Sequence, residues 1–372
     1  MLTAAICSPD IDPALATGLR TANVAGRQVG CALFETDEVA FDPASPAQRH
    51  RVLVRKRAFS CSFRERTLIL GLSTLLDAGR FAPFGSEFVA DVLAVGDAVT
   101  TLAPGDRVLS NGSYGAPLPD GAPQGLVTNQ ASHALQIIHA DKLRRAPAAL
   151  DDARAAGFST CAQTAFAMAR RLDIRAGERV LVTAATSSTS LFLVQRLARV
   201  GAHVVALTGA TQHAERLRAL GAREVLEVDL ARKDWDLGGA LLRSFHADGA
   251  FDAAVDPFCD LYLPRILPFL RFGGRYSSCG FVEQRSGFSG DALPFGPNDL
   301  RATITSVISG NITLVGNCLG TSEDLEAALA AFERGELEVP VDEVFGGEEV
   351  GAFVERSFGR GRQLGKVVFR YA

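Results

Sequence analysis

The spacing of hydrophobic and polar positions changes near residue 150. Before that point, short segments such as Val52–Lys56 and Val89–Val95 alternate between apolar and polar residues, and turns containing Gly and Pro separate them. Alternation with a period of two is typical of half-buried β-strands. Residues 111–125 contain so much Gly and Pro that they predict a loop. The first part of the chain is therefore predicted to be an irregular all-β domain, with a barrel as one way to remove sheet edges.

After residue 150, strand-sized apolar segments alternate with segments of helical periodicity. The predicted strands are Arg179–Thr183, His203–Leu207, Glu224–Val228, Phe251–Val255, Gly274–Ser278 and Ile312–Val315. The predicted helices include Cys161–Arg171, Leu191–Val200, Ala214–Leu220 and Asp324–Arg334. Such alternation predicts an α/β fold with a doubly wound parallel sheet. The last apolar segment, Gly365–Arg370, is a lone strand that is free to return to the first domain.

Composition and charge exclude several classes of partner. The 372 residues are 47% hydrophobic and 22% charged, with a net charge of −4 and with acids and bases mixed along the chain. This balance fits two globular domains and gives no basic surface for nucleic acid. No apolar run is long enough to cross a membrane, and the start does not resemble a signal peptide. The seven cysteines are scattered, which predicts buried thiols and a cytoplasmic location rather than disulfides or a structural zinc.

An ordered series of motifs resembles the medium-chain dehydrogenase/reductase superfamily. The series comprises VLVRKRAFSCSFRE (52–65), GSEFVADVLAVGDAV (85–99), PGDRV (104–108), AGERVLVTAA (176–185), AERLRALGAREV (214–225), FDAAVDP (251–257), FGGRYSSCG (272–280), LVGNCLGTSEDLEAAL (314–329) and GKVVF (365–369). The quinone oxidoreductase and enoyl reductase branches are the most similar, whereas the first 50 residues match poorly. The resemblance implies a GroES-like domain over residues 1–150, completed by 321–372, and a Rossmann-type domain over 151–320.

The resemblance also shows where a catalytic zinc would be bound, and the ligands are missing. Zinc-dependent members supply a Cys, a His and a second Cys. The corresponding positions here are Ser62, Ser86 and Ala156, so we expect no metal. Cys61 does not replace the first ligand, because a shift of one residue in an extended segment turns the side chain to the opposite face.

The nucleotide-binding loop lacks glycine. Family members have a glycine-rich turn after the first Rossmann strand, but residues 183–190 read TAATSSTS. In one interpretation, the backbone N–H groups and the hydroxyls of Ser187, Ser188 and Thr189 bind the pyrophosphate of a nucleotide. In the other, nucleotide binding has been lost and Ser188 or Thr189 only caps the helix. We favour binding, because all eight residues are small.

Other positions predict the type of cofactor. The second strand ends in Thr208 and Gly209 rather than in an acidic residue, and His213 and Arg216 follow, which favours NADP(H) over NAD(H). A solvated helix face explains Arg216 equally well. The resemblance places Ser62 and Thr164 near the nicotinamide and Cys279 and Gly280 after the strand beside it. Ser62 either hydrogen-bonds a substrate carbonyl or the cofactor, or is satisfied by its own backbone.

Three functions remain open on this scaffold. The first is a zinc-independent, NADPH-dependent oxidoreductase that reduces an activated C=C or C=O bond in an enone, an enoyl thioester or a quinone. The second is a non-redox lyase or isomerase, and the third is a non-catalytic binding subunit. The substrate is expected to be a small molecule. The resemblance also implies a homodimer, in which residues 302–317 extend one sheet across two subunits.

Overall fold

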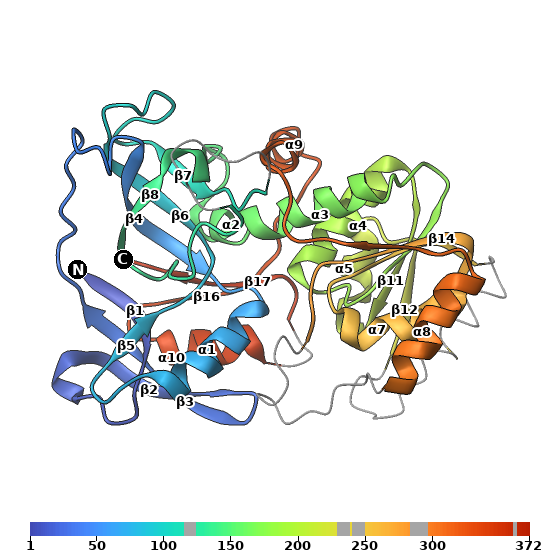
Figure 1. The fold of residues 1–372 in the computed structure, drawn as a ribbon, viewed down its shortest axis with the longest axis horizontal. Helices are drawn as coiled ribbons and strands as arrows, with labels where there is room; N and C mark the ends of the chain where they lie inside the picture. Colours follow the sequence, from blue (N-terminus) through green and yellow to red (C-terminus); the bar gives the residue numbers. More distant parts are fainter. Residues whose placement is uncertain (115–123, 229–238, 240–249, 283–296, 360–362) are drawn as a thin grey trace. The chain divides into compact units, whose positions relative to one another are not determined.

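The computed structural model describes residues 1–114, 124–228, 239, 250–282, 297–359 and 363–372. Contacts between Cα atoms divide the chain into two compact units (Figure 1). The first unit contains residues 1–160, 341–359 and 366–372, and the second contains residues 161–340 and 360–365. The domain boundaries expected from the sequence, at residues 150/151 and 320/321, stay predictions.

The first unit contains two β-sheets. The larger has seven strands in the order β16-β17-β4-β6-β7-β9, with β8 paired to β4. Its strands are β4 (Arg51–Ser60), β6 (Glu87–Val95), β7 (Arg107–Ser110), β8 (Leu135–His139), β9 (Leu143–Arg145), β16 (Val341–Gly346) and β17 (Lys366–Arg370). The C-terminal strand returns to the first unit, as the sequence allowed, and pairs with β4, which lies more than 300 residues earlier in the chain.

The first 50 residues, which have no counterpart among the motifs, build most of the second sheet. It has four strands in the order β2-β3-β1-β5, with β1 (Leu2–Cys7), β2 (Ala16–Val24), β3 (Arg27–Glu35) and β5 (Phe81–Pro83). A short 3₁₀ helix, Pro13–Leu15, precedes β2. The helices of this unit are α1 (Arg64–Leu75), α2 (Asp152–Ala156) and α10 (Val350–Phe358), and a second 3₁₀ helix spans Ala140–Lys142.

An aromatic cluster forms part of the core of the first unit. The Phe59 ring on β4 lies 5.7 Å from Phe84, 5.2 Å from Phe353 and 5.5 Å from Phe369, measured between ring centroids. Phe353 belongs to α10, whose buried residues recur at helical spacing, and Phe369 belongs to β17. Aromatic pairs of this kind contribute about 0.5–1.5 kcal/mol each beyond their buried area. The cluster thus ties the C-terminal elements to β4.

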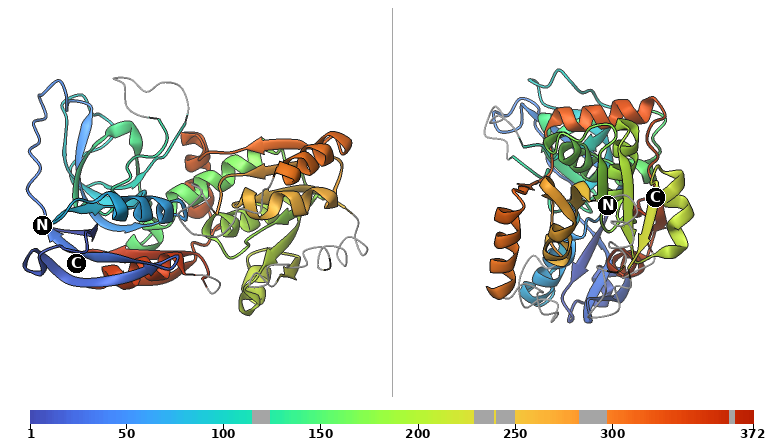
Figure 2. Two further views of the ribbon diagram at one scale, coloured as in Figure 1. Left: turned by 60° about the horizontal axis from the view of Figure 1, so that its bottom comes forward. Right: turned by 90° about the vertical axis from the view of Figure 1, so that its right-hand side faces the viewer.

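The second unit is a doubly wound sheet of six parallel strands in the order β12-β11-β10-β13-β14-β15. The strands are β10 (Arg179–Val182), β11 (His203–Thr208), β12 (Glu224–Glu227), β13 (Phe251–Asp256), β14 (Leu270–Ser278) and β15 (Thr313–Gly316). The helices are α4 (Ser188–Val200) and α5 (Ala214–Ala219) on one face and α7 (Cys259–Ile266) and α8 (Pro297–Ser309) on the other (Figure 2). Helix α3 (Ser159–Arg171) leads into this unit, α9 (Ser322–Glu333) follows the sheet, and 3₁₀ turns span Thr211–His213 and Leu267–Phe269.

The predicted α/β fold class is confirmed, but one segment differs from expectation. Residues 302–317 were expected to contribute a strand region, whereas their first half belongs to helix α8 and only Thr313–Gly316 is a strand. Gly310 and Asn311 end the helix, and Asn311 has a left-handed φ of 49°. No helix within the described ranges is long and apolar enough to cross a membrane.

Candidate functional site

Strand register places the polar groups around Ser62 on one face of the first unit's larger sheet. Ser60 on β4 lies opposite Glu87 on β6 and opposite Val368 on β17. Directly opposed residues in antiparallel strands share a face, and so do residues two apart. Lys366 is two residues before Val368, and Ser62 is two residues after Ser60. The register therefore directs Lys366 toward Ser62 and Glu87.

Lys366 provides a buried positive charge beside Ser62. Its Nζ lies 2.5 Å from Oε1 of Glu87, 2.8 Å from the carbonyl oxygen of Cys61 and 3.1 Å from Oγ of Ser62. The side chain is only 5% exposed. An ammonium group has three N–H donors, and these three oxygens match them. Gly157 makes room for this lysine, since a Cβ there would lie 2.9 Å from Cβ of Lys366.

Glu87 is fully buried and holds several groups of the first unit in place. In addition to the Lys366 ammonium, its carboxylate accepts hydrogen bonds from Oγ of Ser60 at 2.9 Å and from the backbone N–H of Thr160 at 2.8 Å. Ser60 also donates to the carbonyl of Ala156 at 2.8 Å. Glu87 therefore orients its neighbours and is itself fixed by them.

A second buried carboxylate, Glu65, fixes the backbone of Ser62. Its Oε2 accepts from the Ser62 N–H at 2.5 Å, while the Glu65 N–H donates to the Ser62 carbonyl at 2.9 Å. Burial raises the pKa of Glu65, and the positive charges of Lys366 and Arg64 and the Ser62 N–H oppose this effect. The buried cluster pairs two carboxylates with two cations, because Arg64 lies 2.9 Å from Glu65.

These residues do not fit a zinc ion. Ser62, Ser86 and Ala156 stand where the family resemblance places the zinc ligands, and neutral hydroxyls and a methyl group are poor zinc ligands. The Lys366 ammonium beside Ser62 repels a second cation. Burial raises the pKa of the Cys61 thiol well above its ordinary value, which disfavours the thiolate that a metal needs. Within the described ranges, no three or more His, Cys, Asp or Glu side chains gather at metal-binding distances.

Hydroxyl groups of residues 183–190 form hydrogen bonds with the backbone of the same segment, which follows β10. Ser187 is the N-cap of α4, and its Oγ accepts from the Ser190 N–H at 3.4 Å. The buried Oγ of Ser190 donates to the carbonyl of Thr183 at 2.8 Å. Ala184 adopts a left-handed φ of 42°, a conformation that glycine accepts more readily. The sequence predicted Ser188 or Thr189 as the helix cap, whereas the structure has Ser187 in that role.

The start of α4 still presents donors for an anion. Within the described part of the chain, no acceptor lies within hydrogen-bond distance of the backbone N–H groups of Ser188 and Thr189. Both side chains are partly exposed. A helix of 13 residues adds the favourable field of its N-terminus. The loop residues therefore fit a nucleotide pyrophosphate, although the roles predicted for Ser187, Ser188 and Thr189 stay predictions.

The predicted adenosine-side residues follow β11. Thr208 is buried, and its Oγ1 accepts from the Ala210 N–H at 3.0 Å. His213 ends a 3₁₀ turn before α5. Arg216 on α5 forms an ion pair with Glu338, and both side chains are about half exposed. Whether Arg216 binds a phosphate or belongs to a solvated helix face therefore stays a prediction.

The predicted nicotinamide-side residues of the second unit are Thr164, Cys279 and Gly280. Thr164 is buried in α3, one turn after Cys161. Burial raises the pKa of the Cys279 thiol, and the nearby Asp256, Cys161 and Cys318 raise it further. A Cβ at Gly280 would lie 2.9 Å from the carbonyl oxygen of Pro257, so this position is tight. Ser62 belongs to the first unit, and its predicted place beside the nicotinamide stays a prediction.

Sequence reasoning missed a buried carboxylate beside the loop. Asp256 ends β13 and accepts hydrogen bonds from Thr183 Oγ1 at 2.7 Å, from the Phe258 N–H at 2.8 Å and from the Tyr276 hydroxyl. Burial raises its pKa from the ordinary 3.8 to about 6, against the effect of these donors. Asp256 links β13 to the first residue of the loop. The motif FDAAVDP contained this residue, but only the parallel register of β10 and β13 shows its partner.

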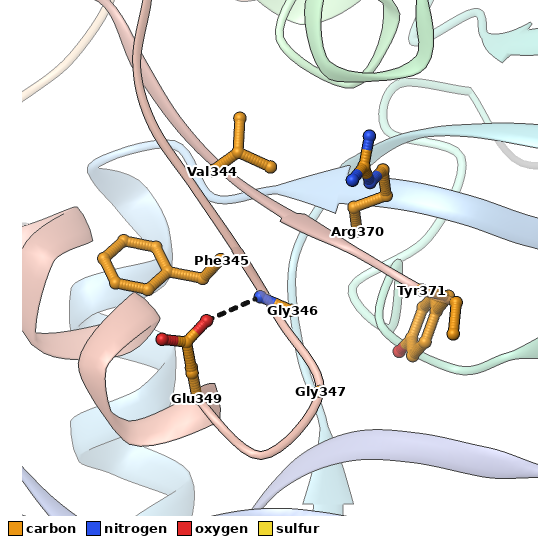
Figure 3. A pocket seen from close by; sticks show the side chains of 8 residues that line it. Val344, Phe345, Gly346, Gly347, Glu349, Arg370 and Tyr371 are labelled. Carbon is orange, nitrogen blue, oxygen red and sulfur yellow. Dashed lines mark hydrogen bonds between the residues drawn. The ribbon is translucent and has the colours of Figure 1, made fainter.

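A separate hollow of about 350 Å³ lies at the end of β16 and β17 in the first unit (Figure 3). Val344, Phe345, Gly346, Gly347, Glu349, Arg370, Tyr371 and Ala372 line it. A Glu349 carboxylate oxygen accepts from the Gly346 N–H at 3.1 Å and closes the turn between β16 and α10. None of the predicted site residues lines this hollow.

Comparisons with known proteins agree with the geometry. A family model described as zinc-binding dehydrogenase matches residues 189–334. Erythronolide synthase EryA2 of Saccharopolyspora erythraea is 29% identical over 332 residues, which are 86% of this chain and 8% of that protein. The chain thus spans less than a tenth of the length of this relative.

Solved structures show the same fold. An NAD-dependent alcohol dehydrogenase superposes with a TM-score of 0.72 at 22% identity, covering 96% of this chain and all of that one. The CurK enoyl reductase superposes with a TM-score of 0.69 at 16% identity, and both chains are covered in full. Together with the ordered motifs and the six-stranded parallel sheet, these findings show that the chain is similar to proteins of the medium-chain dehydrogenase/reductase type and has their fold, a GroES-like domain joined to a Rossmann domain.

Proposed function

We propose that the protein is a zinc-independent, NADPH-dependent reductase of an activated C=C or C=O bond in a small molecule such as an enone, an enoyl thioester or a quinone. The observation that carries this proposal is the replacement of the zinc ligands by Ser62, Ser86 and Ala156, with the Lys366 ammonium 3.1 Å from Ser62 Oγ. Without a Lewis acid, an isolated alcohol is difficult to oxidise, whereas a conjugated acceptor is already activated. Similarity to a solved enoyl reductase supports the enoyl thioester among the three substrate classes.

The second unit supplies the proposed nucleotide site. When bound, NADPH supplies the hydride. The Ser188 and Thr189 N–H groups at the start of α4 would hold its pyrophosphate, with the hydroxyls of Ser187 and Thr189 nearby. Thr208 and Gly209 bring no negative charge to the end of β11, so a 2′-phosphate is not repelled there. Arg216 would exchange its partly exposed partner Glu338 for the phosphate, assisted by His213.

Three further residues of the second unit belong to this proposal. Thr164, Cys279 and Gly280 would line the nicotinamide part of the site. Their support is the family resemblance together with the proximity of Cys279 to Cys161. The Cys279 thiol stays protonated at neutral pH because burial raises its pKa, so we assign it packing and not nucleophilic chemistry.

Nucleotide binding measured by calorimetry tests this proposal. We expect the wild-type protein to bind NADPH in the micromolar range and NADH more weakly. Ser188→Glu places a carboxylate at the pyrophosphate position and should abolish binding of both. Arg216→Ala should weaken NADPH about tenfold, equivalent to about 1.4 kcal/mol, and leave NADH unchanged. Arg218→Ala is the matched control, because Arg218 lies on the same helix and pairs only locally with Glu215 at 2.5 Å.

Two outcomes would contradict the proposal in different ways. If neither nucleotide binds at millimolar concentration, the redox function is wrong, and a non-redox enzyme or a binding subunit is the better description. If NADH and NADPH bind equally and Arg216→Ala has no effect, the redox function stands but the cofactor assignment is wrong.

We also propose a homodimer formed through the second unit. Strand β15 is the last strand of the six-stranded sheet, and Leu314 on it is exposed. Leu300, Ile304 and Ile308 recur every four residues on α8 and are 58%, 44% and 71% exposed. A second copy that continues the sheet at β15 would cover both features around a two-fold axis. Light scattering after chromatography should show a dimer that Ile304→Lys with Ile308→Lys converts to a monomer.

The cytoplasm is the proposed location. None of the seven cysteines, all of which lie in the described ranges, forms a disulfide, and this supports a reducing compartment.

A further inference from the structure

The hydroxyl group of Ser62, beside the Lys366 ammonium, has a proton that the structural role of the buried charges does not use. Ser62 receives an N–H from the Lys366 ammonium at 3.1 Å, so one lone pair of Oγ is occupied and the O–H proton must point elsewhere. Within the described ranges, no oxygen or nitrogen accepts this proton. Ser62 is only partly buried.

The surroundings hold this hydroxyl in one position. Glu65 fixes the backbone of Ser62 through two hydrogen bonds: its carboxylate accepts from the Ser62 N–H at 2.5 Å, and its own N–H donates to the Ser62 carbonyl at 2.9 Å. Glu87, buried and bound to Ser60 and to the Thr160 N–H, fixes the ammonium. A donor held in place before its acceptor arrives costs little reorganisation when charge develops on that acceptor.

We infer that Ser62 donates its hydroxyl hydrogen bond to the carbonyl oxygen of an α,β-unsaturated thioester or ketone, and that Lys366, held by Glu87, is the positioning residue that aims this donor. This inference rests on the proposed function and narrows it to substrates with a carbonyl conjugated to the reduced C=C bond.

The chemistry of such a substrate matches the site. NADPH, when bound, would supply the hydride that forms a C–H bond at the β-carbon, and it would leave as NADP⁺. The π electron pair of the C=C bond would move toward the carbonyl, whose oxygen would become an enolate oxygen. A proton from water then forms the second C–H bond at the α-carbon, and the carbonyl is restored. Negative charge on the carbonyl oxygen is therefore transient. The Ser62 hydroxyl and the nearby Lys366 ammonium would stabilise this charge in the enolate, where it is largest.

The first experiment measures carbonyl polarisation without turnover. The probe is crotonyl-pantetheine with a ¹³C-labelled carbonyl, whose chemical shift is recorded free and bound to the full-length protein. We expect a downfield shift on binding that is lost in Ser62→Ala and kept in Ser62→Thr. Ser73→Ala is the matched control, since the Ser73 hydroxyl on α1 donates only to the carbonyl of Leu70. An unchanged shift in Ser62→Ala, or no binding to the wild type, would overturn the inference.

The second experiment tests Lys366. Lys366→Met leaves the buried Glu87 carboxylate without its counter-charge, so the double variant Glu87→Gln with Lys366→Met is the folded comparison. We expect it to bind the probe with a reduced shift and, with NADPH, to lower kcat about tenfold with little change in KM. Ser62→Ala should lower kcat about a hundredfold, the effect of removing one such donor. Full polarisation and full kcat in the folded double variant would show that Lys366 is only structural.

Failure of the proposed function is separable from failure of this inference. NADPH binding depends on the loop of the second unit and is measured without the thioester. A protein that polarises the thioester carbonyl but binds no NADPH would retain the inferred carbonyl site and lose the reductase assignment. A protein that binds NADPH but leaves the carbonyl shift unchanged would lose the inference alone.

Discussion

The sharpest stability prediction concerns the buried pair of Lys366 and Glu87. Their side chains are 5% and 0% exposed, and Nζ and Oε1 are 2.5 Å apart. Lys366→Met removes the cation and leaves the Glu87 carboxylate with only Ser60 and the Thr160 N–H. Removing one partner of a buried pair typically costs about 3–5 kcal/mol, because the remaining charge stays desolvated. We expect the free energy of unfolding of the first unit to fall by this amount.

The second substitution shows whether the charge causes this loss. In Glu87→Gln with Lys366→Met, the amide oxygen still accepts from the Thr160 N–H, and the amide N–H₂ faces Ser60, whose hydroxyl keeps its bond to the Ala156 carbonyl. No unpaired buried charge remains at position 87. The double variant should therefore recover about 2–3 kcal/mol relative to Lys366→Met alone, a coupling expected for residues in direct contact.

Urea-dependent hydrogen exchange of peptides from β4 and β17 is the suitable assay, because it reports the first unit separately from the second. Arg145→Met is the control within the same unit. Arg145 lies 2.8 Å from Asp106, but its side chain is 61% exposed, so less than about 1 kcal/mol should be lost. The reasoning is refuted if Lys366→Met is as stable as this control, or if the double variant is no more stable than Lys366→Met.

Three further predictions concern single residues. Ala184→Gly should raise the melting temperature of the second unit slightly, because relief of the left-handed φ of 42° outweighs the added freedom of glycine in the unfolded chain, with a net gain of up to about 1 kcal/mol by calorimetry. Asp256 has a pKa of about 6 in the folded state against 3.8, so the folded state binds the proton more tightly, and stability should fall by about 3 kcal/mol as the pH rises from 3.8 through 6. Asp256→Asn should remove that loss in urea titrations at pH 4 and 7. The Nζ atom of Lys56 lies 2.6 Å from Gln136 Oε1 and 3.8 Å from the Phe88 ring centroid, and burial lowers the pKa of this ammonium. The unfolded state therefore binds more protons than the folded state, and the free energy of unfolding should rise with pH up to 10.5. Lys56→Met should therefore stabilise the first unit by at least about 1 kcal/mol at pH 7 and by less at pH 10.

Each of these has an outcome that contradicts it. A lower melting temperature for Ala184→Gly would mean that the loop gains more from the stiffness of alanine than it loses to strain. If the free energy of unfolding of Asp256→Asn changes between pH 4 and 7 as it does in the wild type, Asp256 is not the group that titrates. Equal gains for Lys56→Met at both pH values would mean that the ammonium is charged in the folded state.

Local patterns were sufficient to predict the second unit. Its strands are short and apolar, and in the described ranges β10, β11 and β13 are each followed by a helix, so periodicity indicates the parallel sheet. Strands β11 and β13 begin where the pattern placed them. The region of α8 was misjudged because its apolar residues at 300, 304 and 308 face outward, and a strand and an exposed helix stripe look alike in a short segment. The first 50 residues had no motif, and only long-range pairing of β1 with β3 and β5 gives them a structure.

The candidate site was predicted only in part. The family resemblance and the residues at positions 62, 86 and 156 led to the expectation that no zinc is bound, which stays a prediction. The role of Lys366 was not predictable, because it depends on β17 pairing with β4 across about 300 residues, and its motif reads as an ordinary strand. Likewise, neither the bond from Ser190 to Thr183 nor the pair of Arg216 with Glu338 has a local signal. Side-chain chemistry marks a candidate, whereas its partner is set by tertiary contacts.

The return of β17 to β4 also sets an order of events during synthesis. Residues 1–160 leave the ribosome first, but the strand that completes their sheet and carries the counter-charge of Glu87 is made about 200 residues later. At roughly 5–20 residues per second, this interval is roughly 10–40 s. During it, the Phe59 face of β4 lacks Phe353 and Phe369, and the edge of β4 lacks its partner strand from Ala58 to Ser60. We therefore expect the nascent first unit to expose an apolar strand that chaperones can cover, whereas all of the second unit except residues 360–365 is made as one segment.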